Sequence, residues 1–228
     1  MKHSHHQEYK PIRDIIFGFN DGLVSTLALV AGLTGALLTN KVIVIAGLAE
    51  VAAGAISMGL GAYISSKSQQ EYYTTQIKTE RYAISKYPDM ERKEIEKIYM
   101  KKGLRGKELK EIVDTITANK KRWLNTTLQE GLGLTGLSKY NPKRIAIIFF
   151  LSFIIGAVIP LFPFTAFSVL TSFKIAIVSS VIAVFIVGAV KTYYTKRNWF
   201  KSGIEMVMIA GIATIAAFYI GQLIGSLY

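Results

Sequence analysis

The feature that most constrains this chain is a set of long stretches with almost no charged residues. The hydrocarbon core of a bilayer is about 30 Å thick, so a helix needs about 20 mostly apolar residues to cross it. Five stretches reach or approach this length: Ile15–Leu38, Val42–Ile64, Ile145–Leu161, Ile175–Val190 and Gly203–Leu227. The third and fourth are short, and we expect flanking Tyr, Phe and Ser residues to complete them. The sequence therefore predicts an all-α membrane protein with five transmembrane helices.

The charged residues lie between these stretches, and their distribution predicts an orientation. Of 27 Lys and Arg residues, most lie between the second and third stretches, whereas the loop 162–173 carries no charge. Because basic loops stay on the cytoplasmic side, we expect a multi-pass protein with its N-terminus and central loop in the cytoplasm. The C-terminus then lies outside or in an organelle lumen, and in a prokaryote the membrane would be the cell membrane. The net charge of +12 is explained by these loops, so no nucleic-acid partner is expected.

The central loop is long enough to fold by itself. We expect an N-terminal tail and two transmembrane helices over residues 1–65, a cytoplasmic helical domain over 66–144, and three transmembrane helices over 145–228. Pro88 should end the helix that continues the second stretch, and Asp89 is placed to cap the next helix. Two further helices are expected near 107–118 and 120–132. So small an insert would be marginally stable alone, and packing against a second copy, as a homodimer, is one hypothesis.

Several chemistries are excluded by composition. The chain has no cysteine, which rules out disulfides and thiolate metal sites. The first ten residues lack the apolar core of a signal peptide. His3, His5 and His6 could bind metal weakly or be the remnant of an added tag, so they are given no role. No Ser–His or Cys–His pair falls within a stretch, and we do not expect an enzyme or a resident cofactor.

Two carboxyl groups stand where a bilayer makes them costly. Asp21 lies inside the first stretch and Glu50 inside the second. An ionisable group at the centre of a span costs at least about 2.5–3.5 kcal/mol, so each one indicates a functional site. The alternative for a single such residue is a protonated carboxyl or a structural hydrogen bond to a neighbouring helix. That alternative weakens for two carboxyls on adjacent spans, because both can face the same interior.

Helical geometry connects these carboxyls to a methionine. At 1.5 Å per residue, Asp21 lies about 9 Å from the cytoplasmic end of its span, and Met58 lies at a similar depth on the antiparallel second span. Glu50, Gly54 and Met58 are four residues apart and share one helix face. A thioether favours softer transition metals over magnesium or calcium, and carboxylates bind protons in competition with metal. The pattern permits a metal path from Asp21 and Met58 to Glu50.

The first two stretches also resemble a known family. Residues 13–32 read RDIIFGFNDGLVSTLALVAG, and the second stretch contains Glu50 followed by SMGLGAY at 57–63. Together with Tyr99–Leu104 and the segment from Trp123 to Leu134, they resemble the vacuolar iron transporter family over nearly the whole chain. The resemblance implies a dimer that exports Fe²⁺, Mn²⁺ or both from the cytosol in exchange for H⁺. It implies that Asp21, Glu50 and Met58 line the path.

The same resemblance implies a second metal site in the insert. Iron-carrying members gather metal there with clustered glutamates and a methionine pair, and Glu80, Glu91, Glu94 and Glu130 match such glutamates. The chain departs from this pattern elsewhere: Ala83 and Gly131 replace expected glutamates, and Thr126, Thr127 and Leu128 occupy the place of the methionine pair. The membrane path is therefore expected to be intact, and the insert site to be depleted.

A different class of protein would also fit part of the sequence. The strongly basic insert suits a non-transporting membrane protein that binds a partner or anionic membrane lipid. Such a protein would have no need of Asp21 and Glu50. Replacing either residue with alanine separates the two hypotheses, because only a transporter loses its function.

Overall fold

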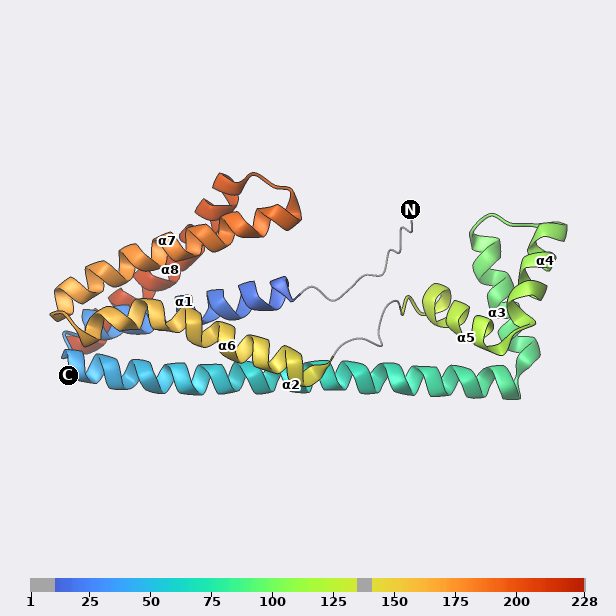
Figure 1. Ribbon diagram of the computed structural model, residues 1–228, viewed down its shortest axis with the longest axis horizontal. Helices are drawn as coiled ribbons and strands as arrows, with labels where there is room; N and C mark the ends of the chain where they lie inside the picture. The colour runs from blue at the N-terminus through green and yellow to red at the C-terminus, as the bar shows by residue number, and fades with distance from the viewer. Residues whose placement is uncertain (1–10, 135–140, 228) are drawn as a thin grey trace. The chain divides into compact units, whose positions relative to one another are not determined.

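The computed structural model describes residues 11–134 and 141–227, and His3, His5 and His6 lie outside these ranges. In chain order the helices are α1 (Ile12–Gly35), α2 (Asn40–Lys86), α3 (Pro88–Lys101), α4 (Gly106–Thr117), α5 (Lys120–Thr126), α6 (Pro142–Leu161), α7 (Val169–Thr195) and α8 (Trp199–Gly225) (Figure 1). A π-helical turn, Thr127–Gly131, follows α5, and a 3₁₀ turn, Phe162–Thr165, follows α6. None of the described residues forms a strand, which confirms the all-α class.

Five helices are long and apolar enough to cross a membrane: α1, the first part of α2, α6 with its 3₁₀ turn, α7 and α8. The prediction of five spans is confirmed, although several boundaries move. α1 begins at Ile12, three residues before the expected start, because Arg13 and Asp14 are helical too. α6 begins at Pro142, where the Asn141 side chain accepts a hydrogen bond from the Lys143 N–H. The chain is a multi-pass integral membrane protein.

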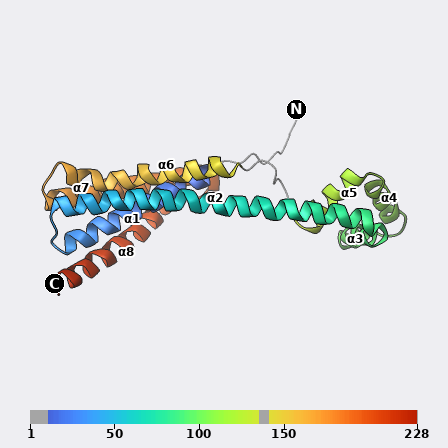
Figure 2. The ribbon, with the colours of Figure 1, turned by 90° about the horizontal axis from the view of Figure 1, so that it is seen from below.

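The described residues fall into two units. We call residues 11–64 and 141–227 the bundle, and residues 65–134 the insert; α2 contributes to both. In the bundle, α1 contacts α6, α7 and α8, and α7 also contacts α8 (Figure 2). The fully buried side chains of Leu23, Val30 and Phe153 lie in this interior. The helix that carries Asp21 is thus surrounded by other helices.

Glycines allow α1 to approach its neighbours closely. A Cβ at Gly22 would overlap the backbone of Phe153 on α6, and one at Gly156 would overlap the backbone of Phe19 on α1. On the other side of α1, Gly221 of α8 contacts Gly32. The Gly221–Gly225 motif, which suits a helix interface within or between subunits, therefore forms an interface within this chain.

The insert has an apolar core of its own. Leu109, Val113 and Ile116 on one face of α4 are buried against Trp123 of α5 and Ile95 of α3. The helices expected near 107–118 and 120–132 are confirmed, with the second ending in the π-helical turn. Its start is capped by the side chain of Asn119.

The expected cap at Asp89 is wrong. Pro88 occupies the first helical position of α3, and Tyr87, which precedes it, makes no capping hydrogen bond through its side chain. Proline suits this position because its missing N–H would have no partner within the helix. Asp89 lies instead in the first turn, where its negative charge is favourable near the helix N-terminus.

Candidate metal-transport site

Asp21 and Glu50 lie close enough for their carboxylates to repel each other when both are ionised. Asp21 is on α1 and Glu50 on the first part of α2, and both side chains are half-buried. Among the described residues, no hydrogen bond or ion pair is formed to either carboxylate. The two groups predicted to share an interior face are therefore neighbours, and neither has a protein partner that would stabilise its charge.

Met58 lies on the same side of α2, against α6. Its side chain packs on the cluster of Ala55, Phe153 and Ala157. A Cβ at Gly54, one turn before Met58, would overlap the ring of Phe153. Gly54 and Met58 thus face α6, as their spacing with Glu50 predicts. The thioether is half-buried in an apolar environment.

Phe153 is the residue that joins α1 and α2 at this site. Its backbone packs against Gly22 of α1, next to Asp21. Its ring packs against Gly54 of α2, one turn from Glu50. The side chain is 1% exposed, so it fills the space between the two helices. Sequence reasoning missed it, because α6 is almost entirely apolar after Arg144 and no pattern marks one of its phenylalanines.

A second group of acidic residues lies in the insert, on the end of α2 and the start of α3. Glu80 and Glu91 are half-buried and Glu94 is exposed. Burial, followed by repulsion from Glu80 and Glu94, raises the pKa of Glu91. Burial, followed by repulsion from Glu94, raises the pKa of Glu80. The three glutamates predicted from the resemblance are thus neighbours in space.

One oxygen of this group lacks a partner. Oε2 of Glu91 is buried and accepts no hydrogen bond within the described part of the chain. A buried carboxylate oxygen without a donor is unfavourable, and a cation or a proton would satisfy it. Even so, no three His, Asp or Glu side chains among the described residues are arranged to hold one metal ion. The glutamates are adjacent without surrounding a common point.

Glu130, the fourth glutamate, stands apart from the other three. Its carboxylate accepts a hydrogen bond from the Lys102 ammonium, and the two form an ion pair. This hydrogen bond is the main reason that the pKa of Lys102 is raised. A carboxylate held by a lysine is a weaker ligand for a cation, because the metal must displace the ammonium.

Two of the residues that depart from the family pattern, Thr127 and Leu128, belong to the interior of the insert. Thr127 and Leu128 are buried, and the Thr127 hydroxyl donates a hydrogen bond to the Trp123 carbonyl, 3.2 Å away. Where the resemblance implies a methionine pair, this chain has interior packing within a π-helical turn. This stretch offers no soft ligand.

Comparisons with known proteins identify the family of this chain. The model of the VIT family matches residues 12–222, which include α1 and nearly all of α8. The chain belongs to the VIT family. Among its relatives, a vacuolar iron transporter of Centaurea cyanus is 38% identical over 95% of this chain and 89% of its own length. Vacuolar iron transporter 1 of Arabidopsis thaliana is 35% identical over 93% and 86%, and a Plasmodium falciparum vacuolar iron transporter is 31% identical over 96% and 84%.

Membership of the VIT family confirms the resemblance drawn from residues 13–32 and from the second span. VIT family members are transporters and not enzymes, in agreement with the expectation from the sequence. The matched region covers both the bundle and the insert.

Proposed function

We propose that this chain exports divalent transition-metal cations, Fe²⁺, Mn²⁺ or both, from the cytosol in exchange for protons. The observation that carries the proposal is the pair of neighbouring carboxyls, Asp21 and Glu50, to which no described residue donates a hydrogen bond or forms an ion pair. Ionised carboxyls without partners are costly in a bilayer. A divalent cation removes that cost by binding both, and protons remove it by neutralising both. Competition between these two states is what an exchanger requires.

Met58 would set which cations are accepted. Oxygen ligands alone suit magnesium and calcium, whereas a thioether favours softer ions. Met58 and the carboxyl of Glu50 lie on one face of α2, two turns apart, and that face packs against α6. A cation that leaves the cytosol along this face would meet the sulfur of Met58 and then the carboxylate of Glu50. The names of the relatives, vacuolar iron transporters, support iron as a substrate.

The direction of transport depends on orientation. The N-terminus and the insert are proposed to be cytoplasmic, because the loops that contain them are basic while the loop between α6 and α7 is uncharged. The C-terminus is then outside the cell or in an organelle lumen. Metal would enter the bundle from the cytoplasmic end of α1 and leave on the opposite side.

The insert would deliver metal to the bundle rather than translocate it. Glu80, Glu91 and Glu94 repel one another and Glu91 has an unpartnered oxygen, so a cation near them is favoured. A complete ligand set would need a further group. A homodimer could supply it from a second insert, and dimerisation would also enlarge a small hydrophobic core.

The test is transport by the full chain in liposomes with a pH-sensitive dye inside and a pH gradient, acidic inside. We expect Fe²⁺ and Mn²⁺ to enter while the interior becomes alkaline. Liposomes that contain folded protein but show neither metal uptake nor proton movement would refute transport. Metal uptake without proton movement would refute the exchange and leave a uniporter.

A further inference from the structure

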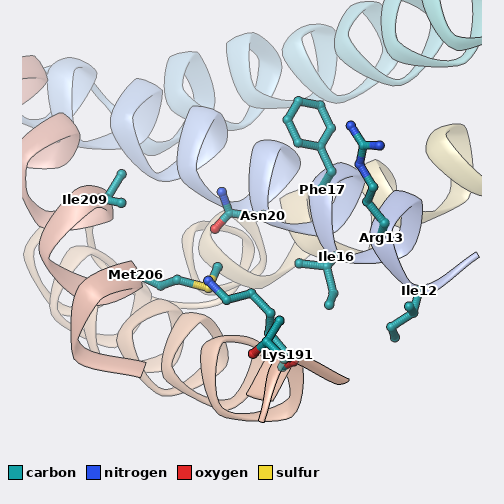
Figure 3. Close-up of a pocket in the computed structure, with 9 residues that line it drawn as sticks. Ile12, Arg13, Ile16, Phe17, Asn20, Lys191, Met206 and Ile209 are labelled. Carbon is teal, nitrogen blue, oxygen red and sulfur yellow. Dashed lines mark hydrogen bonds between the residues drawn. The ribbon is translucent and has the colours of Figure 1, made fainter. Parts of the chain in front are cut away.

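A cavity of about 440 Å³ opens between α1, α7 and α8, and its lining does not include Asp21, Glu50 or Met58 (Figure 3). Its walls come from the first turns of α1, the last turns of α7 and the first half of α8. It lies wholly within the bundle. The volume is typical of a site for a small molecule, and the proposed metal path gives it no occupant.

The cavity combines apolar walls with two basic residues. Ile16 and Phe17 of α1 and Ile209 of α8 form much of the wall, and Arg13 and Lys191 contribute the cations. In Figure 3 the Lys191 side chain extends from α7 toward the part of the cavity near Asn20 and Met206, whereas the Arg13 guanidinium turns toward Phe17. One positive charge therefore reaches inside, and a second lies at the edge.

No described residue forms an ion pair with either cation, Arg13 or Lys191. The residues that line the cavity include these two basic side chains and no acidic one. This field repels metal cations and attracts anions.

The apolar side of the cavity is open toward the lipid. Phe17 is 57% exposed and Ile209 is 58% exposed, although both belong to membrane-spanning helices. A free anion such as inorganic phosphate would gain nothing from these surfaces. A ligand with an anionic head and a hydrocarbon chain would bind both parts, and basic pockets between transmembrane helices bind such lipids.

We propose that this cavity binds one anionic phospholipid. Its phosphate lies near Lys191 and Arg13, and an acyl chain lies against Ile16, Phe17 and Ile209. The lipid bridges α1, which carries Asp21, to α7 and α8. The site is separate from the basic insert, so lipid binding here requires no residue of the insert.

The test uses the full chain in detergent, with native mass spectrometry to count retained lipids. Phosphatidylglycerol and phosphatidylcholine with identical acyl chains are added in equal amounts. We expect the wild type to retain phosphatidylglycerol preferentially. Lys191→Gln should lower that retention about fivefold, the effect of one basic side chain near anionic headgroups. Lys201→Gln, which removes an exposed charge at the same end of the bundle, is the matched control and should retain it normally.

A second variant separates loss of the site from loss of the fold. Ile16→Trp fills the cavity and keeps both charges, and it should also reduce retention; thermal unfolding in lipid-free detergent checks that each variant is folded. Equal retention of the two lipids by the wild type would overturn the proposal. So would equal losses in Lys191→Gln and Lys201→Gln, unchanged retention in Lys191→Gln and Ile16→Trp, or displacement of the lipid by inorganic phosphate.

Discussion

The bundle and the insert both bring carboxylates together, but their surroundings differ. Asp21 and Glu50 lie on helices that cross the membrane, where water is scarce, and no described residue donates a hydrogen bond to either group. Glu80, Glu91 and Glu94 lie on helices of the insert, where Glu94 is exposed and water can solvate it. Binding of a cation or of protons is therefore necessary for the carboxylates of the bundle and optional for those of the insert. A carboxylate pair in the bundle needs a cation or protons, whereas the insert can tolerate its charges.

The carboxylates of the bundle and of the insert also differ in how rigidly their surroundings hold them. In the bundle, Gly22 packs on the backbone of Phe153 and Gly54 packs on its ring, so two helices are held closely against one buried residue beside Asp21 and Glu50. In the insert, Glu130 is paired with Lys102 in an exposed ion pair. Exposed ion pairs contribute little to stability, so the insert could rearrange around a metal at small cost.

The largest effect on stability should come from Gly22→Ala. The added Cβ would overlap the Phe153 backbone, and overpacking of this kind costs about 1–3 kcal/mol. Thermal unfolding of the full chain in detergent measures the change. Gly61→Ala is the control, because a Cβ there meets nothing within 4 Å. Equal unfolding temperatures for both variants would mean that α1 does not rest on α6 in this way.

Replacement of the Met58 sulfur should change the selectivity between Fe²⁺ and Mn²⁺ more than the maximal rate of transport. Met58→Leu nearly preserves volume, and we expect the apparent affinity for Fe²⁺ to fall by about tenfold, the lower end of what altered partners of metal sites cost. The affinity for Mn²⁺, a harder ion, should fall less. Concentration-dependent flux in liposomes gives both values. Met208→Leu alters an exposed methionine of α8 and should have no effect; the same loss for both metals would remove Met58 from the selectivity mechanism.

In the insert, Glu91→Gln should stabilise the fold. The folded-state pKa of Glu91 is raised, so its contribution to stability is most favourable below the ordinary pKa of 4.5 and is lost as the pH rises through the raised value. At neutral pH the variant should unfold a few degrees higher, and its stability should depend less on pH. Trp123 reports this unfolding in the full chain when Trp199 is replaced by Phe. A lower unfolding temperature would mean that Glu91 has a stabilising partner.

The smallest effect should come from Lys102→Gln, which frees Glu130. In the Asp21→Asn background, where the bundle site is weakened, Mn²⁺ binding by the full chain should increase slightly while stability changes little. Lys107→Gln is the control, because Lys107 pairs with Glu111, 3.7 Å away, which is not among the predicted ligands. Equal binding by both variants would show that Glu130 is not a ligand of the insert.

Much of the fold could be predicted because a membrane imposes simple requirements. Apolar length predicted the five spans, and Pro88 predicted the end of α2. The start of α1 was misplaced, since polar residues at the end of a span can be helical as well. Asp89 was misassigned as a cap because the sequence alone does not show that Pro88 already occupies the first helical position.

The site was predictable where its residues are chemically unusual for their location. Asp21 and Glu50 are carboxyls within apolar runs, and the free-energy cost of placing them in a bilayer identifies them as site candidates. Phe153 and Lys191 carry no such mark, because one is a phenylalanine in an apolar helix and the other a lysine near the end of a span. The pairing of Lys102 with Glu130 depends on the tertiary fold, since 28 residues separate them.

The most direct test compares the two regions in one transport measurement. Liposomes carry the wild type, Asp21→Asn, or a triple variant with Glu80, Glu91 and Glu94 replaced by Gln, and Fe²⁺ uptake and internal pH are followed together. We predict that Asp21→Asn reduces metal and proton movement to the level of protein-free liposomes. The triple variant should keep proton-coupled transport and require more metal to reach the same rate. Transport retained by Asp21→Asn, or abolished in a folded triple variant, would contradict the account.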